Sequence, residues 1–147
     1  MKRKTIFLTV DVVSFVVKSK KTEVLLIQRK YPPFKNKWAL PGGFVNYGER
    51  RKNAARRELK EETGASIKKL VEIGVFDDPK RDPRGHVVST AYLAVVKNKE
   101  IKIKAADDAK KAKFFSVKNL PPLSFDHAKI IKRAISLYNK IKNIPQH

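Results

Sequence analysis

The sequence predicts a single α/β domain over residues 1–147, in which five or six strands combine with one internal and one terminal helix. This inventory is typical of an α+β fold or an α/β/α sandwich. Three observations support it. The length fits one domain, since domains usually hold ~100–150 residues. The hydrophobic content of 41% argues against disorder, and apolar β-branched runs alternate with two segments of helical periodicity.

The first half of the chain predicts three strands. Residues 5–17 form a long apolar, β-branched segment, and residues 23–28 follow after a polar turn, so the pair predicts a hairpin. Two prolines make residues 31–36 a loop, because proline cannot donate to a strand ladder. Residues 38–40 predict a short strand, which ends at Pro41 and the two glycines that follow.

Residues 49–63 predict the clearest helix. Ala54, Ala55 and Leu59 share a face that can pack on a core, while the charged side chains lie elsewhere. Gly64 is the residue type expected just past the end of a helix.

The second half predicts three more strands and a terminal helix. The strands span residues 67–76, 87–96 and 113–117, and a loop with two prolines lies between the first two. Residues 125–141 predict the final helix, because their apolar side chains recur on one side.

The net charge of +20 is unevenly distributed. Residues 49–82 hold 10 basic and 8 acidic residues, whereas the rest of the chain carries a balance of +18. A positive field attracts anions, so an anionic ligand held over a local cluster of carboxylates is expected. The chain has no cysteine, which excludes a disulfide framework, a Cys-ligated zinc site and a thiol nucleophile.

Three carboxylates, Glu58, Glu61 and Glu62, follow one another at i, i+3 and i+4 in the predicted helix. Side chains at these spacings share a face, and their mutual repulsion would be removed by a divalent cation. Oxygen-only ligands suit Mg²⁺, Mn²⁺ or Ca²⁺ better than zinc.

The surrounding segment resembles the Nudix box. That pattern is Gly, five residues, Glu, seven residues, Arg-Glu, an aliphatic, one residue, Glu-Glu, one residue, Gly and an aliphatic. Every charged and glycine position of the pattern is matched, by Gly43, Glu49, Arg57, Glu58, Glu61, Glu62 and Gly64. Ala65 is smaller than the usual final aliphatic. The resemblance extends in outline to the whole chain and implies an α/β fold, the Nudix-type α/β/α sandwich with a mixed central sheet.

The resemblance also implies roles for these residues. The three box carboxylates would bind Mg²⁺, or alternatively Mn²⁺, together with the backbone carbonyl of Gly42. Arg57 would orient the carboxylates and pair with Glu49, and Gly43 and Gly64 would support the box. The reaction would be hydrolysis of a nucleoside diphosphate linked to another group.

A general base must accept a proton from the attacking water. In this family it often comes from a loop outside the box, and Asp108, in the Lys-rich segment before residue 113, is the predicted base. Glu61 is the alternative within the box, and Asp107 with Asp108 could instead form a turn or a helix cap.

The loop of residues 77–86 resembles that of ADP-ribose pyrophosphatases within the family. Its two guanidiniums, Arg81 and Arg84, can bind phosphate or ribose oxygens, unless they pair with nearby acids and only shape the loop. Arg29 is a further candidate for phosphate, and Phe44 or Tyr47 could stack on a base.

The predicted function is therefore Mg²⁺-dependent hydrolysis of ADP-ribose to AMP and ribose 5-phosphate. The alternatives are a Nudix hydrolase of nucleoside triphosphates or of RNA 5′-triphosphate ends, and a non-catalytic Nudix-fold sensor. The predicted partner is a small nucleoside diphosphate derivative, with no specific nucleic acid and no membrane. A cytoplasmic location is expected. A homodimer through residues 5–17 is left open, against the simpler role of those residues as a core strand.

Overall fold

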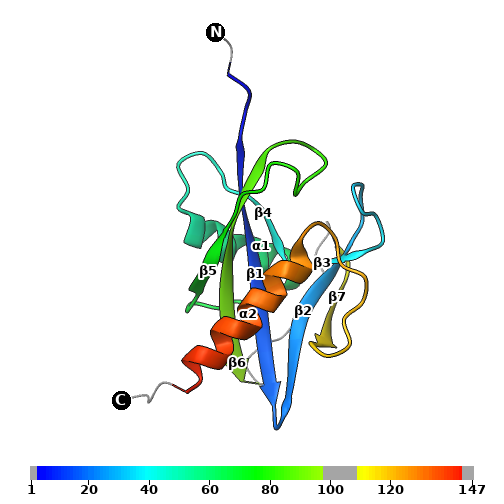
Figure 1. The fold of residues 1–147 in the computed structure, drawn as a ribbon, viewed down its shortest axis with the longest axis vertical. Coiled ribbons are helices and arrows are strands. Elements are labelled where there is room, and N and C mark those ends of the chain that lie inside the picture. Colours follow the sequence, from blue (N-terminus) through cyan, green and yellow to red (C-terminus); the bar gives the residue numbers. More distant parts are fainter. Residues whose placement is uncertain (1–2, 98–108, 144–147) are drawn as a thin grey trace.

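The structure is a computed structural model that describes residues 3–97 and 109–143. Within these described residues, seven strands form one sheet in the order β3-β2-β1-β6-β5, with β4 paired to β1 and β7 paired to β2 (Figure 1). The strands are β1 (Phe7–Lys18), β2 (Lys21–Arg29), β3 (Trp38–Ala39), β4 (Gly42–Phe44), β5 (Val71–Phe76), β6 (Val87–Lys97) and β7 (Ala109–Ser116). β1 and β6 run parallel and the other pairs are antiparallel, so the sheet is mixed, as predicted.

The helices α1 (Arg51–Thr63) and α2 (His127–Ile141) cover opposite faces of this sheet (Figure 1). Alternate side chains of β1 explain the two layers, because successive residues of a strand point to opposite faces. Val10 and Val12 pack in the cluster that includes Leu59 of α1, and Val13 and Phe15 pack in the cluster of α2. The α/β/α sandwich is confirmed. Among the described residues, neither helix is long and apolar enough to cross a membrane.

Several boundaries differ from the predictions. The hairpin is confirmed, with Lys18 opposite Lys21. The strand predicted over residues 67–76 begins only at Val71, where pairing with β6 begins. β4 begins at the two glycines where the predicted strand over residues 38–40 was expected to end. Its glycines allow the chain to approach β1, since a Cβ on Gly42 would overlap the carbonyl oxygen of Val10.

The helix carrying the box begins at Arg51, so Glu49 precedes it rather than forming its first turn. Glu49 instead accepts a hydrogen bond from the backbone N–H of Asn46, at 3.1 Å. The predicted end is confirmed. Gly64 has a φ of 78° and its N–H bonds to the carbonyl of Lys60 at 2.8 Å.

Candidate active site

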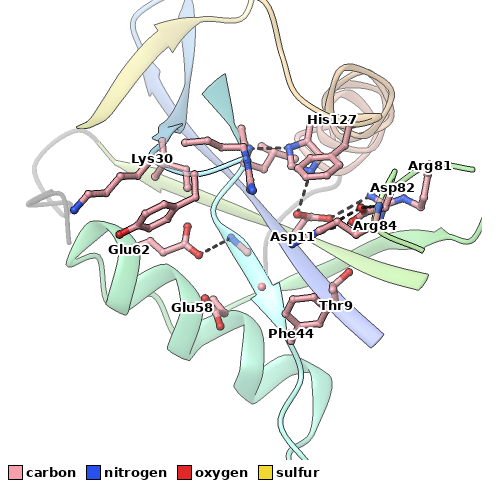
Figure 2. A pocket seen from close by; sticks show the side chains of 18 of the residues that line it. Thr9, Asp11, Lys30, Phe44, Glu58, Glu62, Arg81, Asp82, Arg84 and His127 are labelled. Carbon is pink, nitrogen blue, oxygen red and sulfur yellow. Dashed lines mark hydrogen bonds and ion pairs between the residues drawn. The ribbon is translucent and has the colours of Figure 1, made fainter. Parts of the chain in front are cut away.

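A pocket of about 340 Å³ opens beside β4. Carboxylates of α1 lie on one side of it, with Lys30 near them, and Arg81 and Arg84 from the loop between β5 and β6 lie on the other (Figure 2). The floor comes from β1 and from the start of α2. The fold thus brings the predicted box and the predicted substrate loop to one cavity.

Glu58 and Glu62 extend from α1 toward β4 (Figure 2). Glu62 is buried, and its Oε1 accepts a long hydrogen bond from the N–H of Gly42, at 3.3 Å. Burial first, and then the neighbouring Glu58 carboxylate, raise the pKa of Glu62 well above its usual value. Among the residues that the structure describes, no group donates a hydrogen bond to Glu62 Oε2, although this atom is buried.

These observations fit a divalent cation. A buried carboxylate oxygen without a donor, next to a second carboxylate, is a costly arrangement that a cation would relieve. Within residues 3–97 and 109–143, no three His, Asp or Glu side chains form a group that could hold a metal by themselves. Mg²⁺ needs no such group, because it commonly binds one or two carboxylates together with waters and substrate phosphates.

Gly43 makes room for the Glu58 carboxylate. A Cβ built on Gly43 would lie 2.6 Å from the Glu58 carboxyl carbon and from Oε1, and 2.7 Å from Oε2. Any side chain at this position would therefore displace the carboxylate. This contact explains why the first position of the box is a glycine.

Arg57 connects the box residues. Its Nε and Nη2 donate to the two carboxylate oxygens of Glu49 at 2.8 and 3.0 Å, which confirms the predicted pair. Its Nη1 donates to Glu58 at 2.8 Å and to Glu61 at 3.2 Å, and Nη2 also reaches the carbonyl of Phe44 at 3.0 Å. The bond to Arg57 first, together with the bond from Asn46 and the positive charge of Arg57, lowers the pKa of Glu49 to about 2.

The third predicted ligand, Glu61, shares Arg57 Nη1 with Glu58 but is not among the residues that line the pocket. Its side chain is 58% exposed and pairs with Arg57, whereas Glu58 and Glu62 line the pocket. The predicted base, Asp108, lies outside the described residues. The structure therefore brings together two of the three box carboxylates, and the roles of Glu61 and Asp108 stay predictions.

The two arginines of the substrate loop differ. Arg84 lines the pocket while its Nε and Nη2 pair with the buried Asp82 at 3.1 and 2.8 Å, so it both shapes the loop and faces the cavity. Arg81 also borders the pocket, but its side chain is only 4% exposed and donates twice to Asp126, at 2.9 and 2.6 Å. Arg29, the further candidate for binding phosphate, also lines the pocket.

The two aromatic candidates for base stacking are also separated. Phe44 lines the pocket, whereas Tyr47 is fully exposed and is not part of the lining. Of the two, only Phe44 is placed to contact a ligand in this cavity.

The pocket floor contains polar residues that the sequence analysis did not select. Asp11 Oδ2 accepts from Ser89 Oγ at 2.6 Å, and His127 Nε2 lies 3.3 Å from Asp11 Oδ1. Because His127 Nδ1 accepts from the N–H of Leu40 at 3.0 Å, its ring proton is on Nε2. Burial alone would raise the pKa of Asp11, but His127, Ser89 and the charge of Arg81 outweigh burial and lower it. In the sequence, the charged Asp11 inside an apolar strand could have indicated this polar site.

Comparison with known proteins identifies the class. The family model of the NUDIX domain matches residues 8–134, and the chain belongs to the Nudix family. The resemblance of the box is thus confirmed. Across 113 residues the chain is 53% identical to a protein of Methanocaldococcus jannaschii named ADP-ribose pyrophosphatase, an alignment that covers 77% of this chain and 66% of that protein.

Two solved structures are similar as well. One is the NUDIX domain of Shewanella oneidensis NrtR complexed with ADP ribose, with a TM-score of 0.83 and 30% identity over 91% of this chain and 89% of that one. The other is a bifunctional NMN adenylyltransferase/ADP ribose pyrophosphatase of Francisella tularensis, complexed with AMP and a manganese ion. Its TM-score is 0.77, with 34% identity over 92% of this chain and 43% of that one. Nudix hydrolases depend on divalent metals, and this relative was solved with one.

Proposed function

We propose that this protein hydrolyses the pyrophosphate bond of ADP-ribose to AMP and ribose 5-phosphate, with Mg²⁺ as the cofactor and Mn²⁺ as an alternative. The observation that carries this proposal is Glu62 Oε2, which has no hydrogen-bond partner among the described residues and lies beside Glu58 in a pocket that Arg29 and Arg84 also line. The name of the Methanocaldococcus relative supports the choice of ADP-ribose.

Each side of the pocket has its own part in the proposed mechanism. Glu58, Glu62 and the carbonyl of Gly42 are the groups that would hold the cation. When bound, the cation would screen the charge of the pyrophosphate and lower the pKa of the attacking water. Arg57 holds Glu58 in place through its 2.8 Å bond. Arg29, which also lines the pocket, would bind substrate oxygens.

The proposed chemistry is a single displacement at phosphorus. The water oxygen forms a bond to one phosphorus atom, the bridging P–O bond breaks, and the second phosphate leaves with the bonding electrons. We assign to Asp108 the role of the general base that accepts the proton from the water, with Glu61 as the alternative. Arg84 and Phe44 are assigned to substrate binding. Arg81 stays a predicted contact whose guanidinium is already paired.

A substrate panel tests the function. The protein is incubated with Mg²⁺ and ADP-ribose, NADH, dGTP, a diadenosine polyphosphate or triphosphorylated RNA, and the release of AMP, pyrophosphate and phosphate is measured. ADP-ribose should be cleaved well above the others. Faster cleavage of dGTP or RNA would support the triphosphate alternatives instead. Binding of ADP-ribose without release of AMP would indicate a sensor.

Two variants test the site. Glu62→Gln should reduce the rate by orders of magnitude while the fold is retained, and a loss of only a few-fold would argue against a role in metal binding. Glu72→Gln is the matched control, because Glu72 is an exposed carboxylate of β5 outside this pocket. For the base, Asp108→Asn should alter the pH-rate profile, whereas the same effect from Glu61→Gln alone would transfer the role to Glu61.

We also propose a homodimer. Residues 9–16 of β1 are buried in the core, so the predicted interface is reduced to the exposed start of the strand, where Ile6, Phe7 and Leu8 are 59%, 48% and 39% exposed. Size-exclusion chromatography with light scattering measures the molar mass of the protein in solution. Phe7→Ser should shift the protein from the mass of a dimer toward that of a monomer. The cytoplasmic location and the single domain over residues 1–147 stay predictions.

A further inference from the structure

His127, the first residue of α2, carries a buried imidazole that the proposed mechanism does not use. Its side chain is 5% exposed, and both ring nitrogens have partners. Nδ1 accepts a hydrogen bond from the backbone N–H of Leu40 at 3.0 Å, and Nε2 lies 3.3 Å from Asp11 Oδ1. His127 therefore joins the first turn of α2 to β1 and to the backbone between β3 and β4.

The backbone that leads from β3 into β4 is held from both helical layers. The N–H of Leu40 donates to the imidazole at the start of α2. Two residues later, the N–H of Gly42 donates to Glu62 of α1 at 3.3 Å, and the carbonyl of the same glycine is a proposed ligand of the cation. Pro41, between them, has no N–H to donate, and its carbonyl accepts from β1 at 2.8 Å. The imidazole and the box carboxylate are thus linked through a span of three residues.

Asp11 of β1 determines which ring nitrogen can accept. Its Oδ1 faces Nε2 of His127 and keeps the ring proton there, which leaves Nδ1 as the acceptor for Leu40. Its Oδ2 accepts from Ser89 Oγ at 2.6 Å, so the carboxylate keeps a partner of its own without the imidazole. The two ring nitrogens therefore have separate tasks, and each task can be removed without the other.

The chain that carries the imidazole is fixed relative to β3. Ser124, three residues earlier, donates its N–H and its Oγ to the carbonyl of Trp38, at 2.8 and 3.0 Å. Asp126 accepts two bonds from Arg81, at 2.9 and 2.6 Å. The ring therefore presents Nδ1 to Leu40 from a rigid support. Bonds of this kind, outside the set of metal ligands, orient the ligands that bind a cation.

The bond that this support protects is long. The distance of 3.3 Å between the Gly42 nitrogen and Glu62 Oε1 exceeds the usual range of about 2.7–3.2 Å, so a small displacement of the glycine would break it. Among the described residues, no group donates to the other oxygen of this carboxylate. Loss of the bond would release Oε1 of a proposed metal ligand.

We propose that His127 is a positioning residue for the metal site. Its Nδ1 accepts from the N–H of Leu40 and so sets the place of Gly42, which in turn holds Glu62. The inference deepens the proposed function and rests on it, because the cation is assigned there. It requires no contact of the imidazole with the cation or with the substrate.

Two variants of His127 separate the two ring nitrogens. Counted in bonds from Cβ, the amide oxygen of asparagine takes the place of Nδ1, and the amide nitrogen of glutamine takes the place of Nε2. His127→Asn can therefore still accept from Leu40 but loses the contact with Asp11. His127→Gln keeps that contact and loses the bond to Leu40. Each variant removes one buried contact, so a general loss of stability would affect both.

The affinity for Mn²⁺, measured by electron paramagnetic resonance without substrate, tests the inference. Loss of a partner that orients a metal ligand typically costs about 10- to 100-fold in affinity. The dissociation constant for Mn²⁺ should therefore rise at least about tenfold in His127→Gln and less than about threefold in His127→Asn. His86→Gln is the matched control, because His86 is an imidazole outside this pocket, and it should bind Mn²⁺ like the wild type.

Urea unfolding of each variant shows which of them fold. If His127→Gln does not fold, His127→Asn tests the inference by itself, because it must keep the affinity of the wild type for Mn²⁺. Wild-type affinity in His127→Gln, equal weakening in both variants, or weakening in His127→Asn alone would each overturn the inference. So would a wild-type protein that does not bind Mn²⁺.

Failure of the proposed function gives a different result. The wild type would then bind Mn²⁺ more tightly than His127→Gln, with the affinity retained in His127→Asn, and yet not cleave ADP-ribose.

Discussion

Gly43→Ala should separate catalysis from folding. The new Cβ would lie 2.6 Å from the Glu58 carboxyl group, where ordinary van der Waals contact begins at 3.4 Å, so the carboxylate must move by about 0.8 Å. All the atoms in the way belong to the end of a flexible side chain, and Gly43 is not among the glycines with a positive φ. The backbone can therefore stay in place while the proposed metal ligand cannot.

The size of the effect follows from this displacement. A shift of about 1 Å in a catalytic group can cost about 100-fold, so kcat/KM for ADP-ribose should fall by roughly 30- to 100-fold, or about 2–2.7 kcal/mol. The free energy of unfolding should change by less than about 1 kcal/mol, because alanine also restricts the unfolded chain. Steady-state rates over a Mg²⁺ titration, with urea unfolding in parallel, measure both quantities.

Gly48→Ala is the matched control. Gly48 has a φ of +80°, and no atom would lie within 4 Å of its Cβ. Alanine at this position would therefore strain the backbone without displacing a side chain. This variant should lose about 1 kcal/mol of stability and keep its kcat/KM. The reasoning is refuted if Gly43→Ala retains kcat/KM within threefold of the wild type, or if it unfolds more readily than Gly48→Ala.

Three other predictions concern neighbouring charges. Burial and Glu58 raise the pKa of Glu62, so the folded metal-free protein binds a proton there more tightly than the unfolded chain does. Its free energy of unfolding should therefore fall as pH rises from the usual pKa of 4.5, and urea unfolding in a chelator should show that Glu62→Gln removes this fall. Arg57→Lys loses the forked donors that orient Glu58, and the rate or Mg²⁺ affinity should drop by about 10- to 100-fold in a Mg²⁺ titration. Arg81→Met leaves the buried Asp11 and the half-buried Asp126 without their cation, and urea unfolding should show a loss of about 3–5 kcal/mol.

Each of these predictions has a result that contradicts it. An equal pH dependence of the wild type and Glu62→Gln would mean that Glu62 does not bind the extra proton. A Mg²⁺ titration of Arg57→Lys that matches the wild type would mean that the forked geometry is unimportant. For Arg81, the control is Lys80→Met on the exposed side of the same loop, which should change stability by less than about 0.5 kcal/mol. Equal losses in the two variants would count against the buried ion pairs.

Much of α1 follows from the sequence alone. The spacing of Ala54, Ala55 and Leu59 predicts the buried face, and Gly64 marks the end of the helix. The sequence alone does not determine which partner each side chain contacts. Glu61 shares the helix face with Glu58 in sequence spacing, yet it points to solvent and to Arg57.

Strand boundaries and the pocket floor depend on partners that the local sequence does not contain. β5 begins only where β6 lies beside it, and β4 exists because two glycines can approach β1. The polar floor joins residues far apart in the chain. Asp11 and Ser89 are 78 positions apart, Arg81 and Asp126 are 45, and Leu40 and His127 are 87.

The sequence by itself determined the family resemblance, the helix with its carboxylates and the existence of a substrate loop, because these depend on contacts within a few residues. Only the tertiary structure decided that Arg29 and Arg84 both lie near the Phe125 ring, and that Arg81 is paired to Asp126. The physical reason is that such contacts depend on the order of the strands and on the position where α2 packs. Those arise from burial over the whole sheet, which no local pattern records.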